Sequence, residues 1–311
     1  MCLLGNLSQM NQDSNLVALF QTYLLTEKSV SKNTFSAYRR DIDMLYAFLQ
    51  ESKTSLKSCN KNHLKKYLKI LKLQGLSAKS LSRKISSIKA FFKYLSDRFE
   101  FQNKAQVLVF PKLEKKLPVY LTEEEIQKLL GAANNDNSLK GVRNKVMLYL
   151  IYASGMRVSE LVNLTVDQVH FDTGFVNLIG KGNKERSVPL PKNILGLLRY
   201  YLDSIYSKLL PDGCQKSDFL FFSVYRGLAR AITRQSFWII LKNILKKAYI
   251  SKNISPHSLR HSLATHLLKS GADIRSLQIL LGHEQISTVQ IYTHLEKRQI
   301  RDVYDKKHPR A

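Results

Sequence analysis

Apolar residues recur at three- and four-residue steps through the first third of the chain, and this periodicity restricts the fold more than any other feature. In the stretch opened by Ser77, the repeating positions are Leu81, Ile85, Ile88, Phe92 and Leu95. A second stripe, over residues 33–49, consists of Phe35, Tyr38, Ile42, Leu45 and Leu49. Such stripes form one face of an amphipathic helix. The pattern therefore predicts a helical N-terminal domain over residues 15–105.

A basic, proline-punctuated segment marks the boundary of that domain. It spans residues 106–120, and Thr122 and Glu125 then form the signature of a capping box that begins a new helix. We expect a linker here and a second domain over residues 121–311. Residues 1–14 are mostly polar, so we expect disorder there, with Met10 as an alternative initiator to Met1.

The hydrophobic period changes only briefly in the second domain. Residues Phe175–Ile179 and Ser187–Leu190 read as short strands on either side of a turn, Gly180–Lys184, whose glycines allow a tight reversal. The remainder reads as helices without alternating strands. We therefore predict a mainly α fold with a small antiparallel β-sheet, and a hairpin that carries Lys181 at its tip.

The charge of the chain points to a polyanionic partner. There are 49 Lys and Arg residues against 24 Asp and Glu, a formal charge of +25, and the excess is spread over both halves of the chain. Nucleic acid fits this best, although a basic surface that only confers solubility is the alternative. Candidate DNA contacts on polar helix faces and in the hairpin turn are Lys32, Arg39, Arg83, Lys84 and Lys184.

Cysteine usage and hydropathy indicate the compartment. Cys2, Cys59 and Cys214 are odd in number and far apart, without metal-ligand spacing, so we expect neither a disulfide framework nor a metal site. No segment approaches the ~18 apolar residues of a membrane span, and the apolar start lacks a basic region. These features predict a cytoplasmic protein with no membrane partner.

The candidate chemistry lies near the C-terminus, where five of the eight histidines fall between His257 and His294. Ser255 and Pro256 read as an N-cap and a first helical residue, which places His257 and Arg260 on one face of the first turn. A helix start favours an anion, and arginine can grip a phosphate with two hydrogen bonds. A phosphodiester is the natural occupant of such a site.

Two helix ends follow this site. Gly271 can end the first helix, and a helix over residues 273–281 stops at Gly282, just before His283. Ser287 or Thr288 can cap a last short helix that carries Tyr292. Transfer of a phosphoryl group to tyrosine requires cations and a proton donor, but no metal or other cofactor. Any one of these residues alone is more often structural than catalytic.

Several segments together resemble the tyrosine recombinases, and within them the Xer subfamily, over nearly the full length. The matching segments are Ala153-Ser154-Gly155-Met156-Arg157-Val158-Ser159-Glu160-Leu161, Ile179-Gly180-Lys181-Gly182-Asn183-Lys184-Glu185-Arg186, His257-Ser258-Leu259-Arg260-His261, Leu280-Leu281-Gly282-His283 and Ile291-Tyr292-Thr293-His294. The resemblance implies an N-terminal four-helix, SAM-like DNA-binding domain that closes with a mainly helical catalytic domain as a clamp on double-stranded DNA.

The resemblance also implies the mechanism. Tyr292 attacks the scissile phosphate and forms a 3′-phosphotyrosyl bond, while Arg157 and Arg260 hold the non-bridging oxygens. Lys181 protonates the leaving oxygen, and His257 acts as an acid or base. The remaining two positions are His283, which donates a hydrogen bond to the phosphate, and Glu160, which orients a catalytic group.

The chain end resembles that of the XerD type rather than the XerC type, and its residues are His308-Pro309-Arg310-Ala311. Residues 297–307, however, depart from the sequence that is usual in the family. This implies a heterotetramer with a XerC-like partner, acting at a dif-like site under a septal DNA translocase to resolve chromosome dimers. An integrase or resolvase of a mobile element and a non-catalytic DNA-binding protein are the alternatives. A topoisomerase would share the chemistry, whereas a metal-dependent nuclease would need a carboxylate cluster that is not recognisable here.

Overall fold

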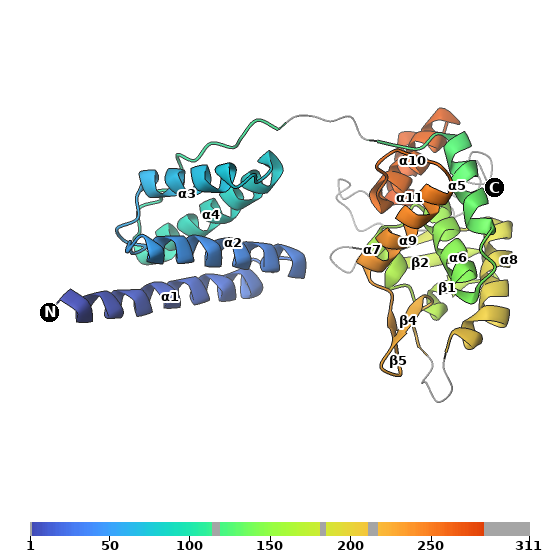
Figure 1. Cartoon of the computed structure of the whole chain (residues 1–311), viewed down its shortest axis with the longest axis horizontal. Coiled ribbons are helices and arrows are strands. Elements are labelled where there is room, and N and C mark those ends of the chain that lie inside the picture. Colours follow the sequence, from blue (N-terminus) through green and yellow to red (C-terminus); the bar gives the residue numbers. More distant parts are fainter. Residues whose placement is uncertain (1, 114–118, 181–184, 211–216, 283–311) are drawn as a thin grey trace. The chain divides into compact units, whose positions relative to one another are not determined.

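The computed structural model describes residues 2–113, 119–180, 185–210 and 217–282, with side chains from residue 12 onward. The chain divides into two compact units, Met1–Lys116 and Leu117–Ala311, shown in Figure 1. Each unit has a hydrophobic core of its own. The two units are therefore separate folded bodies. No helix among the described residues has the length and apolar character needed to cross a membrane.

Over its described residues the first unit contains four helices. They are α1 (Cys2–Thr26), α2 (Lys32–Glu51), α3 (Lys61–Leu73) and α4 (Ala78–Phe99). Ser31, Asn60 and Ser77 cap the last three with side-chain oxygens that accept backbone N–H groups. The predicted stripe on α4 is buried over its whole length, since Leu81, the most exposed of its members, is only 7% exposed. The helical prediction for this part of the chain is confirmed.

The expected disorder at the N-terminus is not what the structure shows, because residues 2–14 form the first part of α1. The carboxylate of Asp13 is buried and accepts a hydrogen bond from the backbone N–H of Leu56 at 2.8 Å. Leu16 and Val17 of the same helix are buried too. The polar composition of residues 1–14 gave no indication that Asp13 is held in this way, and no proline interrupts the residues before it.

The second unit is built around the buried helix α6 (Leu139–Ser154), which packs against α5 (Glu123–Asn134), α8 (Lys192–Tyr200) and α10 (Pro256–Lys269) (Figure 1). Residues 150–154 of α6 are all buried, as expected for a helix surrounded by others. The other helical elements are α7 (Val158–Val162), α9 (Arg234–Lys247), α11 (Ile274–Leu281), η1 (Val166–Gln168), η3 (Tyr201–Tyr206) and η4 (Ser207–Leu209).

A three-stranded antiparallel sheet lies in this unit, in the order β1-β2-β3. Its strands are β1 (Val169–His170), β2 (Phe175–Ile179) and β3 (Glu185–Pro189), with Leu178 opposite Arg186. The predicted small antiparallel sheet is confirmed, and its last strand begins two residues earlier than expected.

A second hairpin, absent from the sequence prediction, projects from the helical body (Figure 1). It pairs β4 (Phe222–Tyr225) with β5 (Leu228–Ala231). Its two turn residues, Arg226 and Gly227, both have positive φ, as a type I′ turn requires. Arginine in place of the usual asparagine or aspartate weakened the signal for this turn.

Two side chains of α10 fix the start of the second unit. Ser262 Oγ accepts the backbone N–H of Leu121 at 2.9 Å, and His266 Nε2 lies 2.9 Å from the carbonyl oxygen of the same residue. Because a carbonyl can only accept, Nε2 carries the proton, and Nδ1 accepts the hydroxyl of Tyr152 at 2.9 Å. Helix α10 is thereby tied to both α6 and residue 121.

Candidate active site

Helix α10 begins as the sequence predicts. Ser255 caps it with a side chain that accepts the backbone N–H of Ser258 at 3.2 Å, and Pro256 is its first residue. His257 is exposed in the first turn, whereas Arg260 is 5% exposed. The aligned peptide dipoles make the start of a helix electropositive, which favours an anion there.

Arg260 is held by the ends of two other helices. Its Nη1 donates to the carbonyl of Gly155 at 2.7 Å, and its Nη2 donates to the carbonyl of Leu281. Burial, followed by the like charges of Arg157 and Arg186, lowers the pKa of Arg260 to about 10. A guanidinium with this pKa remains charged at neutral pH and is positioned by protein contacts rather than by solvent.

Arg157 lies at the turn between α6 and α7, where it is the N-cap residue of α7. Its Nη1 donates to Glu160 Oε1 at 3.0 Å and its Nη2 to the carbonyl of Gly282 at 3.1 Å. The side chain is 38% exposed. Arg157 and Arg260 are thus fixed on successive carbonyls, those of residues 282 and 281, at the end of α11.

Glu160 connects this turn to the sheet. As the third residue of α7, it reaches back to accept the N-cap N–H of Arg157 at 2.7 Å, which completes half of a capping box. It also accepts two hydrogen bonds from Arg186, at 2.8 and 2.7 Å. Burial acts to raise the pKa of Glu160, but the bonds and charge of Arg186, and then of Arg157, outweigh it and lower that pKa.

Arg186 is the site residue that sequence reasoning missed. It lies on β3 and is 6% exposed. Arg186 and Val188 are both buried on either side of the half-buried Ser187, so they share the inner face of the strand. An arginine at an inward-facing strand position needs a buried carboxylate, and this alternation was the available signal.

The cluster as a whole is suited to an anion. The guanidinium groups of Arg157 and Arg186 contact the carboxylate of Glu160, and the charge of Arg260 interacts with all three groups, so the cluster has an excess of two positive charges. A guanidinium has five N–H donors, and within the described residues Arg157 donates from two of its nitrogens, to Glu160 and to the carbonyl of Gly282. Such preorganised donors in a partly buried site stabilise negative charge on phosphate oxygens.

Comparison with known proteins agrees with this geometry. Residues 119–299 match the phage integrase family, and residues 17–98 match its N-terminal SAM-like domain. The chain is 40% identical over 301 residues to tyrosine recombinase XerD of Listeria innocua, covering 96% of this chain and 100% of that protein. The chain belongs to the phage integrase family of tyrosine recombinases.

Further relatives indicate the subfamily within the tyrosine recombinases. The recombinase is 39% identical over 298 residues to tyrosine recombinase XerD of Staphylococcus haemolyticus, covering 95% of this chain and 99% of that protein. A crystal structure of XerH site-specific recombinase bound to difH substrate, a pre-cleavage complex, is 26% identical with a TM-score of 0.65, over 86% of this chain and 78% of that one. The predicted fold class and family are confirmed, and the protein is a Xer-type, XerD-like enzyme that cleaves and rejoins DNA at specific sites.

Four predicted residues of the recombinase lie outside the described part of the chain, namely Lys181, Lys184, His283 and Tyr292. Their roles stay predictions. Among the residues that the structure does describe, no three His, Cys, Asp or Glu side chains gather where they could hold a metal ion. The expectation of metal-free chemistry also stays a prediction.

The predicted DNA contacts of the first unit differ in their surroundings. Lys32 and Arg39 are exposed, and Arg39 lies 3.7 Å from Asp43 one helical turn away. Arg83 is partly exposed and pairs with the buried carboxylate of Asp41. Lys84 is 4% exposed, and its Nζ lies 3.0 Å from Asp41 Oδ1. The helical stripe placed Lys84 on the polar face, but the structure buries it as the partner of Asp41.

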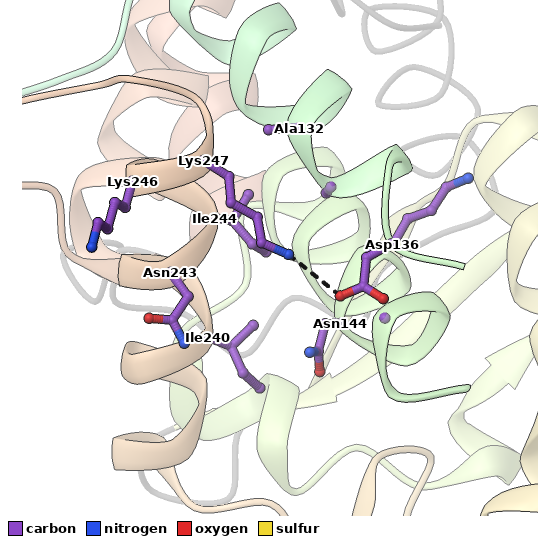
Figure 2. A pocket seen from close by; sticks show the side chains of 11 residues that line it. Ala132, Asp136, Asn144, Ile240, Asn243, Ile244, Lys246 and Lys247 are labelled. Atoms are coloured by element: carbon purple, nitrogen blue, oxygen red, sulfur yellow. Dashed lines mark ion pairs between the residues drawn. The ribbon is translucent and has the colours of Figure 1, made fainter. Parts of the chain in front are cut away.

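A cavity of about 290 Å³ lies apart from the arginine cluster, between residues of α5, α6 and α9. Figure 2 shows Lys247 reaching towards Asp136, with 3.5 Å between Nζ and Oδ2. Both side chains are substantially exposed, and an exposed pair of this kind contributes little. None of the three arginines of the site lines this cavity, so we do not assign the chemistry to it.

Proposed function

We propose that this recombinase holds the scissile phosphate of DNA between Arg157 and Arg260 and cleaves it with Tyr292. The observation that carries the proposal is the fixation of both guanidinium groups on successive carbonyls at the end of α11. Two arginines placed together in this way can each offer N–H groups to the non-bridging oxygens of one phosphate. Tyr292 follows Gly282 by ten residues in the sequence.

In the proposed reaction, the Tyr292 oxygen attacks phosphorus, and the bond from phosphorus to the 5′ oxygen breaks. The tyrosine proton passes to His257, and Lys181 protonates the departing 5′ oxygen. His283 donates a hydrogen bond to the phosphate, while Glu160 orients Arg157. A 5′-hydroxyl of the partner duplex then attacks the phosphotyrosyl bond and releases Tyr292. One phosphodiester is exchanged for another, so neither ATP nor another cofactor is consumed.

For the DNA site and the assembly, we propose a dif-like target, bound by four protomers. Support comes from the difH substrate of the XerH structure and from the XerD names of the relatives. A XerC-like recombinase would complete the tetramer in the cytoplasm. Resolution of chromosome dimers, with a septal DNA translocase as regulator, is the corresponding cellular role. The exposed cations Lys32 and Arg39 and the turn residue Lys184 are proposed as phosphate contacts.

A nicked half-site duplex tests the proposed chemistry. Cleavage next to the nick releases a short strand that diffuses away, so its 5′-hydroxyl cannot reverse the reaction and the covalent intermediate accumulates. We expect the wild-type protein to form an adduct that survives denaturing electrophoresis, with the same yield in a chelator of divalent cations. Tyr292→Phe should bind the duplex but give no adduct. An adduct of undiminished yield with Tyr292→Phe would overturn the assignment.

A further inference from the structure

Arg186 is a buried charge, and its contribution to stability does not explain why it occupies this position. Its side chain is 6% exposed on β3, and both of its terminal nitrogens donate to Glu160 at 2.8 and 2.7 Å. Replacing a buried ion pair by apolar residues of similar size is often neutral or stabilising. A pair that is kept at the edge of a catalytic cluster therefore calls for another reason.

One candidate reason is the electrostatic balance of Glu160. This carboxylate also accepts the backbone N–H and Nη1 of Arg157. If Glu160 had Arg157 as its sole cationic partner, the two charges would offset each other, and the guanidinium would be less available to an anion. Arg186 supplies a second, buried cation to Glu160 and thus leaves the charge of Arg157 uncompensated.

Another candidate reason is the geometry around Gly282. A Cβ added to this glycine would lie 3.0 Å from Cδ of Arg186, so the arginine stem packs directly on the turn. The carbonyl of the same glycine accepts Nη2 of Arg157. Arg186 thus contacts both groups that hold Arg157, Glu160 on one side and the Gly282 turn on the other. Within the described residues its buried Nε has no hydrogen-bond partner, an unusual cost for a purely structural arginine.

We propose that Arg186 is a positioning residue for DNA cleavage, which orients Glu160 and the Gly282 turn and keeps the charge of Arg157 available to the scissile phosphate. The inference rests on the proposed role of Arg157. Arg186 itself does not need to touch the DNA.

The test compares Arg186→Met and Arg186→Lys with Arg143→Met. Arg143 is a matched control because it is also a buried arginine of the second unit, 9% exposed, but donates to the carbonyl of Phe222 and to Asn144. We would measure the first-order rate of adduct formation at saturating nicked half-site, the Kd for that DNA, and the Tm. We expect the rate to fall about 100-fold in Arg186→Met, as when a preorganised electrostatic contact is lost, with Kd within about threefold.

Arg186→Lys retains the charge but only one point of contact, so its rate should lie between those of Arg186→Met and the wild type. Arg143→Met should also lower the Tm, because the carbonyl of Phe222 loses a buried donor, but it should leave the rate per folded molecule within about threefold. Equal rates per folded molecule in Arg186→Met and Arg143→Met would contradict the proposal.

A substrate with a neutral methylphosphonate at the scissile position separates positioning from general damage. This substrate lacks the negative oxygen that Arg157 is proposed to neutralise. The ratio of wild-type to Arg186→Met rates should therefore shrink from about 100-fold to less than about tenfold. An undiminished ratio would show that Arg186 does not act through the phosphate charge. Failure of the wild-type protein to form any adduct with the unmodified phosphate substrate would instead overturn the proposed function.

Discussion

At the scale of single residues, Lys32 and Lys84 show how far the same charge can differ in role. Both lie on helices of the first unit, and both were predicted to contact DNA from the sequence pattern. Lys32 is exposed at the start of α2, whereas Lys84 is buried against Asp41, which also accepts the hydroxyl of Ser87 at 2.8 Å. Periodicity assigns a residue to a face, but it cannot show that a carboxylate from another helix covers that face.

The two lysines should therefore respond differently to substitution. Lys32→Ala should weaken DNA binding and reduce the slope of log Kd against log salt by about one, the loss of one phosphate contact. Lys84→Met should leave that slope unchanged, but it should destabilise the fold by about 3 kcal/mol because Asp41 loses a buried partner. Salt titrations of half-site binding and urea unfolding curves measure the two effects. A reduced slope in Lys84→Met with no loss of stability would show that the lysine contacts DNA after all.

At the scale of elements, the turn after α6 carries Arg157 and also helps to hold Arg260. Gly155 ends the helix in the left-handed conformation, with φ of +61°, and its carbonyl accepts Arg260. The helix ends at Gly271 and Gly282 were predicted from the sequence, because glycine after an apolar run has a direct conformational meaning. The contact between Arg186 and Glu160 depends on tertiary packing, so local sequence rules did not identify this pair.

Gly155 should not tolerate a side chain. A Cβ there would lie 2.8 Å from Leu281 and 2.9 Å from Leu263, in addition to the strain of positive φ. Gly155→Ala should cost about 2–4 kcal/mol in the free energy of unfolding, measured in urea. Gly196→Ala is the matched control, since that exposed position in α8 has open space, and it should stabilise by up to about 1 kcal/mol. Equal effects of the two substitutions would contradict the packing at Gly155.

The link between α10 and Leu121 should make stability depend on pH. Burial, only partly offset by the bond to the Leu121 carbonyl, lowers the pKa of His266 below its ordinary value. The unfolded chain then binds the proton first, so the free energy of unfolding is unaffected above about pH 6.5 and falls as the pH drops below it. The loss due to His266 is at most about 1.4 kcal/mol at pH 5.5.

His266→Gln removes the titrating group, so the difference in stability between the two proteins should shrink as the pH falls from 7.5 to 5.5. Urea unfolding at both pH values measures this difference. A difference that stays constant would mean that His266 titrates alike in the folded and unfolded chains.

At the scale of the whole molecule, much of the account was predictable from sequence. The mainly helical fold, the small antiparallel sheet and the helix start at Ser255 follow from periodicity, capping and glycine placement. The excess of basic residues indicated a nucleic-acid partner, and the motifs indicated the family that the relatives show. Burial of single charges, by contrast, depends on which elements meet, and the pattern along one chain does not determine this.

The central claim is that Tyr292 forms the covalent bond to DNA, and mass spectrometry of the trapped adduct tests it most directly. After digestion with trypsin and nuclease, we expect a nucleotide on the peptide that spans residues 276–297, in which Tyr292 is the only tyrosine. The adduct should survive hydroxylamine treatment, as a phosphotyrosyl bond does. A nucleotide on any other peptide, such as the one that contains Tyr304, would contradict the account.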